Sequence, residues 1–151
     1  MKLSSDIIAC MKRSVLCWLA TVSKDSMPNV SPKEIFCDYG EDHIIVANIA
    51  SPQTVKNLRI NQNVCLSFID IFVQKGYQIK GNSEIVDRTN PEFEKMHIKL
   101  SKMTKGKFPI TNIILIFATS TKQIVAPSYL FYPETTEQQQ IDAAKKTYRF
   151  L

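Results

Sequence analysis

Residues 43–58 read HIIVANIASPQTVKNL, and this stretch predicts a strand that runs directly into a helix. His43–Ile49 is short and almost wholly apolar, which is typical of a strand buried on both faces. Ser51 then precedes Pro52, a pair that favours a helix start because serine caps unpaired N–H groups and proline is tolerated at the first helical position. We therefore expect a helix from Pro52 to about Arg59.

The sequence on either side of this unit is rich in short, β-branched runs separated by polar turns. The run Asn29–Tyr39 follows a turn at residues 24–28, and Gln74-Lys75-Gly76 predicts a turn between two long strands. The predicted strands, besides that at 43–49, are Val15–Ser23, Asn29–Tyr39, Val64–Val73, Tyr77–Asp87, Ile113–Ala118 and a further one within Lys122–Phe131. This pattern favours a mainly β (α+β) fold with an antiparallel barrel over a doubly wound sheet.

Helices are predicted singly between these strands. Ser4 and Ser5 can cap a helix that ends near Arg13, and Asn90 before Pro91 predicts a second helix reaching about Lys105. Residues 136–150 have a mostly polar, helical composition, so this last helix is expected to be peripheral or flexible. No linker or repeat divides the chain, and we expect one domain over residues 1–151.

Composition and charge narrow the class of ligand without choosing one. The chain has 44% hydrophobic and 22% charged residues, which excludes disordered and fibrous classes. Its formal charge of +5 favours an anionic partner. Nucleic acid, a phosphorylated cofactor and acidic lipid all fit that description.

The cysteine pattern and the N-terminal sequence predict where in the cell the protein is found. Cys10, Cys17, Cys37 and Cys65 form no C-x-x-C pair and have no matching histidine spacing, so we expect buried free thiols and no metal site. Free thiols are typical of a reducing compartment. No signal peptide or membrane-spanning run is found in the sequence, and the expected location is the cytoplasm.

Phosphate recognition is the chemistry that the residues favour. Ser51–Asn57 opens a predicted helix, whose unpaired N–H groups attract anions. Lys56 lies one turn inside it, and Lys33 projects from a neighbouring strand toward the same place. The alternative is that Ser51 only caps the helix while both lysines are solvated. His43 and His97 have no evident partners, and we predict no catalytic side chain.

The order of these features resembles the flavin-binding split barrel of the pyridoxamine 5'-phosphate oxidase superfamily. The resemblance covers roughly Ser5 to Asp87. Its motifs are Leu19-Ala20-Thr21-Val22, Pro28-Asn29-Val30-Ser31-Pro32-Lys33, Ala47-Asn48, Ser51-Pro52-Gln53-Thr54-Val55-Lys56-Asn57-Leu58, and Tyr77-Gln78-Ile79-Lys80-Gly81 with Glu84. The resemblance implies a split β-barrel that binds flavin mononucleotide (FMN) at a homodimer interface.

The resemblance also implies a set of cofactor-binding residues. One group would bring strand backbone and a lysine to the flavin, a second would pass under its ring and ribityl chain, a third would hold the phosphate, and a fourth would border the pocket. In that order they are Val30, Ser31, Pro32 and Lys33; Asn48, Ile49, Ala50 and Ser51; Thr54, Lys56 and Asn57; and Gln78 and Lys80. The arginine- and histidine-containing segment that binds substrate in true pyridoxamine phosphate oxidases has no counterpart here, so no substrate is assigned.

Several functions remain open at this point. The leading hypothesis is an FMN-dependent oxidoreductase in which the cofactor carries the chemistry. The alternatives are a flavin carrier or sensor without turnover, and a split barrel that binds deazaflavin or haem. A small basic nucleic-acid-binding barrel is disfavoured, because Trp18, Phe36, Phe68 and Phe117 fall within apolar strand runs and are expected in the core.

Overall fold

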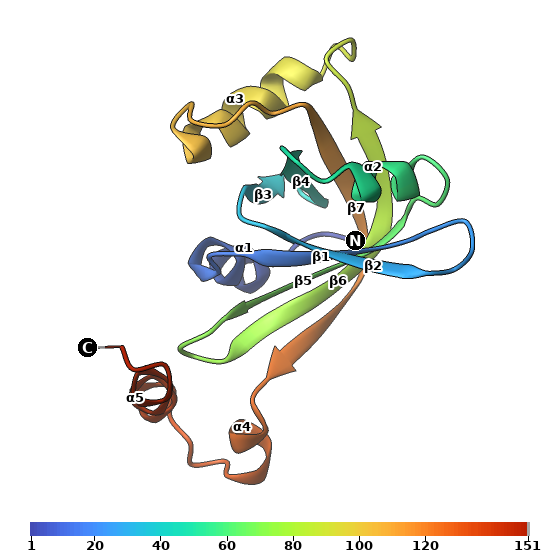
Figure 1. Cartoon of the computed structure of the whole chain (residues 1–151). Helices are drawn as coiled ribbons and strands as arrows, with labels where there is room; N and C mark the ends of the chain where they lie inside the picture. Colours follow the sequence, from blue (N-terminus) through green and yellow to red (C-terminus); the bar gives the residue numbers. More distant parts are fainter. Residues whose placement is uncertain (151) are drawn as a thin grey trace.

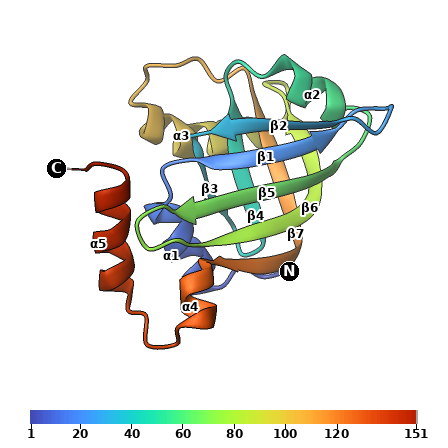
Figure 2. The same ribbon diagram turned by 60° about the horizontal axis from the view of Figure 1, so that its bottom comes forward.

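The computed structural model describes residues 1–150, which build one seven-stranded antiparallel sheet with helices around it. The strands are β1 (Cys17–Val22), β2 (Pro28–Lys33), β3 (Phe36–Tyr39), β4 (His43–Asn48), β5 (Asn63–Asp70), β6 (Lys75–Val86) and β7 (Asn112–Val125). They follow the order β2-β1-β5-β6-β7-β4-β3, and the sheet curls into a half-barrel (Figures 1 and 2). The predicted mainly β split-barrel fold is confirmed.

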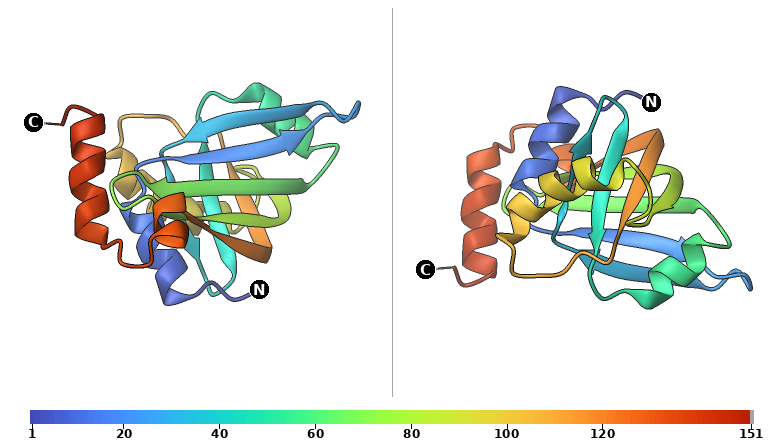
Figure 3. Two further views of the ribbon diagram at one scale, coloured as in Figure 1. Left: turned by 90° about the horizontal axis from the view of Figure 1, so that it is seen from below. Right: turned by 90° about the horizontal axis from the view of Figure 1, so that it is seen from above.

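Five helices lie around the sheet, and two of them mark its opposite ends. They are α1 (Ser5–Arg13), α2 (Pro52–Leu58), α3 (Phe93–Thr104), α4 (Pro127–Phe131) and α5 (Glu137–Thr147). The views in Figure 3 place α2 and α5 at opposite ends of the molecule. The Ser4 hydroxyl caps α1 by accepting the Ile7 N–H at 3.3 Å, as predicted. The start of α3 was predicted too early, because Asn90 and Pro91 form a turn and the helix begins at Phe93.

Strand β4 is buried on both faces, which confirms the prediction from its apolar sequence. On one face Ile44 and Val46 join the core between the sheet and α1. On the other face Ile45 and Ala47 join a second core, which packs against α3. Burial on both faces explains why this strand lacks the apolar and polar alternation of the others.

A β-bulge lets the two longest strands curl. The register between β6 and β7 shifts between Lys80 and Gly81, and the Thr119 hydroxyl donates to the Lys80 carbonyl at 3.0 Å. A Cβ atom on Gly81 would lie 2.2 Å from the Phe117 carbonyl oxygen, so glycine is needed for this close approach. Bulges bend a strand and increase its twist, and this one contributes to the half-barrel shape.

The predicted strand Asn29–Tyr39 is in fact two strands at opposite edges of the sheet. Its first half, β2, pairs with β1, and its second half, β3, pairs with β4. Glu34 and Ile35 connect the two edges, which the curl of the sheet brings together. Proline is tolerated in β2 because it is an edge strand.

One turn and one strand also differ from the predictions. The turn between β5 and β6 is at residues 71–74, where the Asp70 carboxylate accepts the N–H groups of Phe72 and Val73. Gly76 is part of β6 rather than of the turn. Glycine is needed there because a Cβ atom would lie 2.1 Å from the Phe68 carbonyl oxygen on the neighbouring strand. The predicted strand Lys122–Phe131 is a strand only to Val125, where it is the end of β7 rather than a separate strand, and Pro127 then starts α4.

The expected burial of the four aromatic residues holds for two of them. Phe36 and Phe68 are in the core, but Trp18 is 49% exposed and Phe117 is 39% exposed. Trp18 alternates with the buried Cys17 and Leu19 and so points away from the core. Neighbouring side chains along a strand face opposite sides of the sheet, so an apolar residue between two core residues is turned toward the outside.

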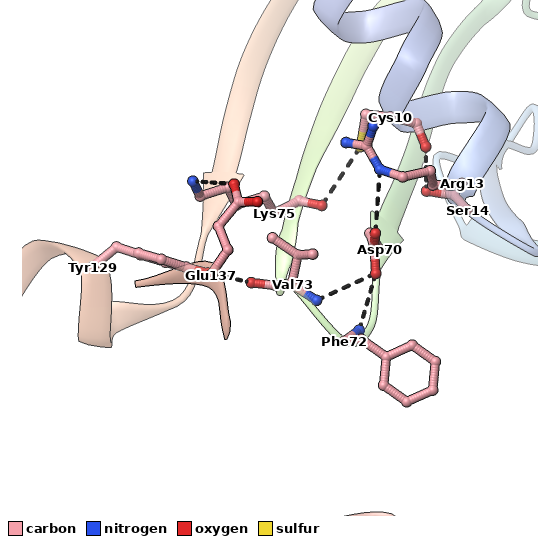
Figure 4. A network of polar contacts seen from close by, with 9 residues as sticks. All are labelled: Cys10, Arg13, Ser14, Asp70, Phe72, Val73, Lys75, Tyr129 and Glu137. Atoms are coloured by element: carbon pink, nitrogen blue, oxygen red, sulfur yellow. Dashed lines mark hydrogen bonds and ion pairs between the residues drawn. The ribbon is translucent and has the colours of Figure 1, made fainter. Parts of the chain in front are cut away.

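The C-terminal helices dock on the turn between β5 and β6 (Figure 4). The Lys75 ammonium lies 2.8 Å from a Glu137 carboxylate oxygen and 4.5 Å from the centre of the Tyr129 ring. The Tyr129 hydroxyl donates to the Val73 carbonyl at 2.8 Å. Thr136 and Gln139 form a capping box that starts α5, so the predicted helix is formed and docked.

The four cysteines are free thiols, as predicted, but the expected burial holds only for Cys10 and Cys17, since Cys37 and Cys65 are partly exposed. Among residues 1–150, no helix has both the length and the apolar character needed to cross a membrane.

We predict that Gly76→Ala lowers the free energy of unfolding by about 2 to 3 kcal/mol, because the added methyl group would collide with backbone. Gly106→Ala is the control: its Cβ meets nothing within 4 Å, and only its φ of +70° opposes the change. It should cost about 1 kcal/mol. Urea unfolding measures both, and equal losses would contradict the role given to Gly76.

Candidate functional site

The short segment between β4 and α2 separates two hollows of similar size. The first, called the Lys33 hollow, has a volume of about 480 Å³. The second, called the Lys56 hollow, has a volume of about 450 Å³. Both are lined by Ile49, Ala50 and Ser51, so these residues form a shared wall. The two volumes lie in the range of small-molecule sites.

Lys33 is the last residue of β2, and its side chain is turned inward. Because side chains alternate along the strand, Lys33 is only 6% exposed while its neighbour Pro32 is exposed. The Lys33 ammonium donates a hydrogen bond to the Ser51 hydroxyl, and the Ser31 hydroxyl lies 3.2 Å from that same oxygen. The structure therefore joins three of the predicted residues in one polar cluster.

The charge of Lys33 has no counterion nearby. Within residues 1–150, no carboxylate oxygen lies within 4.0 Å of its ammonium group. Burial lowers the pKa of Lys33, since desolvation disfavours the charged form. Burial also raises the pKa of the nearby Cys17 to about 12, so that thiol supplies no negative charge at neutral pH. A buried amine of this kind favours an anionic or carbonyl-bearing ligand.

Ser51 occupies the N-cap position of α2 without capping it. Its hydroxyl makes no cap hydrogen bond, contrary to the prediction, because it is engaged by Lys33 and Ser31. The Ser51 N–H donates instead to the side-chain oxygen of Asn48 at 3.2 Å. The N–H groups of Ile49 and Ala50 make no hydrogen bond to the rest of the described chain. They are donors on the wall that a ligand can use.

The Lys56 hollow carries positive charge and no carboxylate lining. Lys56 comes from the exposed side of α2 and Arg59 from its C-cap, while Thr111 immediately precedes β7 and Asn112 begins it. Among these four residues Arg59 forms an ion pair, in which its guanidinium nitrogen lies 3.7 Å from a carboxylate oxygen of Asp87. The side-chain oxygen of Asn112 is buried and has no hydrogen-bond partner among residues 1–150.

The structure does not bring Lys33 and Lys56 into one cradle. Each lysine lines a different hollow, and the wall Ile49–Ser51 lies between the two. The reason is geometric: Lys33 points into the barrel from β2, whereas Lys56 lies on the outer side of α2 and is exposed. The two cations can therefore contact different parts of one elongated ligand.

Thr54 and Asn57 lie on the inner side of α2. The Asn57 amide donates to the Thr21 hydroxyl at 3.0 Å, and its oxygen accepts from Gln53 at 2.7 Å. Thr54 is buried, and its hydroxyl has no partner within the described chain. Neither residue lines one of the two hollows, so the structure places them as supports of α2 rather than beside a ligand.

Three predicted residues lie on the outer face of the sheet. Val30 is 56% exposed on β2, and Gln78 and Lys80 flank the fully buried Ile79 on β6. None of them lines either hollow. Only a second chain could bring them to a ligand bound in the Lys33 or Lys56 hollow.

Several lining residues were missed from the sequence. Arg59 lies three residues after Lys56, and helical spacing alone could have indicated that it shares a face with Lys56. Phe108 comes from the loop after α3, and no sequence pattern connects it to β2. The remaining missed residues of the Lys33 hollow are Leu16, Glu34, Ile35 and Ala47.

Residues 4–123 match the family described as pyridoxamine 5'-phosphate oxidase. The matched region is most of the chain and includes every residue that lines the two hollows. No curated protein sequence matches this chain.

Solved structures with the same fold bind different cofactors. An FMN-binding protein from Syntrophomonas wolfei has a TM-score of 0.64 at 15% identity, covering 80% of this chain and 83% of that one. An F420 reductase has a TM-score of 0.61 at 21% identity, covering 80% and 98%. The haem storage protein HutZ from Vibrio cholerae has a TM-score of 0.60 at 19% identity, covering 83% and 95%. At these identities the likeness concerns the fold.

We predict that Lys33→Met makes the protein more stable at neutral pH, because it removes a buried amine without a counterion. Folding lowers the pKa of Lys33, so between its folded value and the ordinary 10.5 the unfolded chain binds more protons and stability rises with pH. This rise should be absent from Lys33→Met. Denaturant unfolding of both proteins across this pH range measures the difference, and parallel curves would contradict it.

Proposed function

We propose, because this chain belongs to the pyridoxamine 5'-phosphate oxidase family, that it is a flavoprotein that binds FMN across the Lys33 and Lys56 hollows. The observation that carries the proposal is the pair of adjoining hollows with a shared wall, one holding a buried amine and the other two exposed cationic side chains. FMN has the matching parts, a planar ring with polar edges and a phosphorylated chain.

The Lys33 hollow suits the ring. Leu16, Ile35 and Phe108 supply apolar surface, and the N–H groups of Ile49 and Ala50 can donate to carbonyl oxygens or nitrogens at a ring edge. Backbone donors at fixed positions give orientation at little entropic cost. Lys33 would add a positive charge that favours electron-rich forms of the cofactor.

The Lys56 hollow suits the phosphate. Lys56 and Arg59 present two cations, of which Arg59 is paired with Asp87, a residue outside the lining. Arginine and lysine are the usual side chains for phosphate, and the charge-assisted hydrogen bonds they make are stronger than neutral ones. This arrangement replaces the sequence-based hypothesis in which Lys33 and Lys56 grip the phosphate together.

The proposed reaction class is oxidoreduction. A bound flavin supplies electron or hydride transfer, and the protein supplies position, charge and exclusion of water. A flavin carrier or sensor would use the same residues. Steady-state oxidation of reduced nicotinamide separates the two functions, since a carrier would not turn over.

Flavin has more support here than haem. His97 stacks on Phe93 and lies 3.2 Å from the Ser101 hydroxyl, and His43 contacts Asp42 and Phe117. Neither histidine lines the Lys33 or the Lys56 hollow. A histidine ligand to haem iron is therefore not available in either hollow. Deazaflavin fits the hollows as FMN does, and the absorption spectrum of the purified protein distinguishes them.

A homodimer is part of the proposal. Trp18 and Pro32 are direct cross-strand partners, and together with Val30 they form an exposed apolar patch. Pro32 also lines the Lys33 hollow, so the patch reaches the rim of that hollow. A second copy on this patch would cover it and bring further side chains, Gln78 and Lys80 among them, near the flavin.

We predict that Lys56→Ala weakens FMN binding by about 1 to 3 kcal/mol, the worth of a hydrogen bond to a charged group. Riboflavin, which lacks the phosphate, should bind both proteins equally. Quenching of flavin fluorescence measures the affinities. Lys102→Ala, an exposed lysine on α3, is the control and should change neither ligand.

A colourless wild-type protein that shows no FMN binding would end this proposal. If Lys56→Ala lowered the affinities for riboflavin and FMN equally, Lys56 would not contact the phosphate, and the phosphate would have to bind outside the Lys56 hollow.

We predict that Trp18→Glu produces a monomer, because a carboxylate cannot be buried against the apolar patch of a second copy. Light scattering measures the mass, and FMN affinity should fall along with it. Phe131→Glu changes an aromatic residue on α4 that is more exposed, at 76%, and should leave the mass unchanged. A wild-type protein that is monomeric with flavin bound would rule the dimer out.

A further inference from the structure

Independently of flavin binding, we propose that one side of the molecule, made by residues 12–15 and 102–108, rests on the surface of an anionic lipid bilayer. We call this surface the basic tip. From Lys95 to Pro133 the sequence holds lysines but no acidic residue, so positive charge gathers at the end of α3 and in the loop after it. Figure 1 draws this end of α3 well apart from α2 and from α5. The basic tip is therefore a different surface from the Lys56 hollow and from the C-terminal helices.

The lysines of the basic tip are exposed and carry no counterion. Lys102, Lys105 and Lys107 are exposed, and so is Lys12 at the end of α1. Within residues 1–150, no carboxylate oxygen lies within 4.0 Å of any of these four ammonium groups. Lysines that are free in this way are attracted to the negative potential of a bilayer that contains anionic lipids.

A hollow between α1 and α3 joins the two parts of the basic tip. Its volume is about 440 Å³. Lys12 and Val15 line it from the end of α1 and the residues that follow, and Lys99 and Met103 line it from α3. Residues 12–15 and the end of α3 are therefore close together in space, although they are far apart in the sequence.

Two carboxylates line the same hollow, and they do not cancel the charge of the tip. Asp38 lies 3.3 Å from the Lys99 ammonium, so these two charges neutralise each other. Glu34 is exposed and makes no ion pair within the described chain. Its single negative charge faces the four unpaired lysines, so the tip keeps a net positive charge.

Three apolar side chains are exposed among these lysines. Val15 is 77% exposed, Met103 is 43% exposed and Phe108 is 55% exposed. Phe108 lines the Lys33 hollow together with Leu16, the residue after Val15, so all three lie on the same side of the molecule. Apolar side chains in such a place can enter the boundary between headgroups and acyl chains while the lysine ammonium groups stay at the headgroups.

The residue types favour a bilayer over a nucleic acid or an acidic protein. The unpaired cations of the tip are all lysines, since Arg13 is paired with Asp70 at 3.3 Å. Protein interfaces are enriched in arginine and depleted in lysine, and arginine is the preferred side chain for nucleic-acid phosphates. Phe108 is the one aromatic residue of the tip, so no row of rings is present on which bases could stack.

Sedimentation of the purified full chain with vesicles tests this proposal. One set of vesicles is phosphatidylcholine alone, and the other is phosphatidylcholine mixed with an equal amount of phosphatidylserine. The protein should sediment with the mixed vesicles and stay in the supernatant with phosphatidylcholine alone. Added salt should weaken binding, because it screens the attraction between lysines and headgroups.

Matched pairs of lysines make the test specific to the basic tip. Lys105→Gln combined with Lys107→Gln should weaken binding to the mixed vesicles by about 25-fold, since each lysine near such a surface contributes about fivefold. Lys145→Gln combined with Lys146→Gln removes the same charge from exposed positions on α5 and should leave binding unchanged. A melting curve for each variant confirms that it is folded.

A further variant separates the apolar contribution from the charge. Val15→Ser combined with Met103→Ser keeps every charge and should also weaken binding to the mixed vesicles. Its effect should be the same at low and high salt, whereas the effect of the Lys105 and Lys107 changes should shrink as salt is added.

A wild-type protein that ignores the mixed vesicles, or that binds both kinds of vesicle equally, would overturn the proposal without any variant. Equal losses in the α3-loop and α5 lysine variants would overturn it too, because binding would then follow net charge rather than the basic tip. The protein is also titrated with a single-stranded oligonucleotide. Binding of the oligonucleotide that is lost in the Lys105 and Lys107 variant, with no binding to vesicles, would make the tip a nucleic-acid surface instead.

Discussion

Burial of β4 on both faces is the constraint from which the site follows. The strand lies between two cores, one shared with α1 and one shared with α3, so its position and register are strongly determined. At Asn48 the strand ends, and α2 begins four residues later at Pro52. The three residues between them are held at both ends, and they form the wall that the two hollows share.

Lys33 is a position where the sequence departs from what packing alone would favour. An amine buried without a counterion opposes folding, whereas a methionine of similar size would not. The fold tolerates it because β2 is held by β1 along its whole length and because Ser51 accepts its hydrogen bond. Local conflicts with good packing are expected at functional sites, and they are kept where a ligand benefits from them. The same fold carries flavin, F420 and haem proteins, so the cofactor is decided by such individual side chains.

The parts of the fold that could be predicted are those encoded by local patterns. The apolar run of β4, the serine cap of α1 and the capping residues of α5 each act within a few residues of one another. The errors lie where distant strands meet. Gly76 looks like a turn residue, but its lack of a side chain serves a close contact with Phe68 on the neighbouring strand. That contact depends on the register between β5 and β6, which no local pattern records.

The sequence by itself determined the family and the strand-to-helix unit at residues 43–58, and it singled out Lys33, Ser51 and Lys56 as candidate binding residues, because these rest on order and spacing along the chain. Only the tertiary structure decided that Lys33 points into the barrel while Lys56 points out of it, and that the wall between them makes two hollows rather than one. The physical reason is that a side chain's direction depends on which face of its strand or helix is buried. That face is settled by the packing of segments far apart in the sequence.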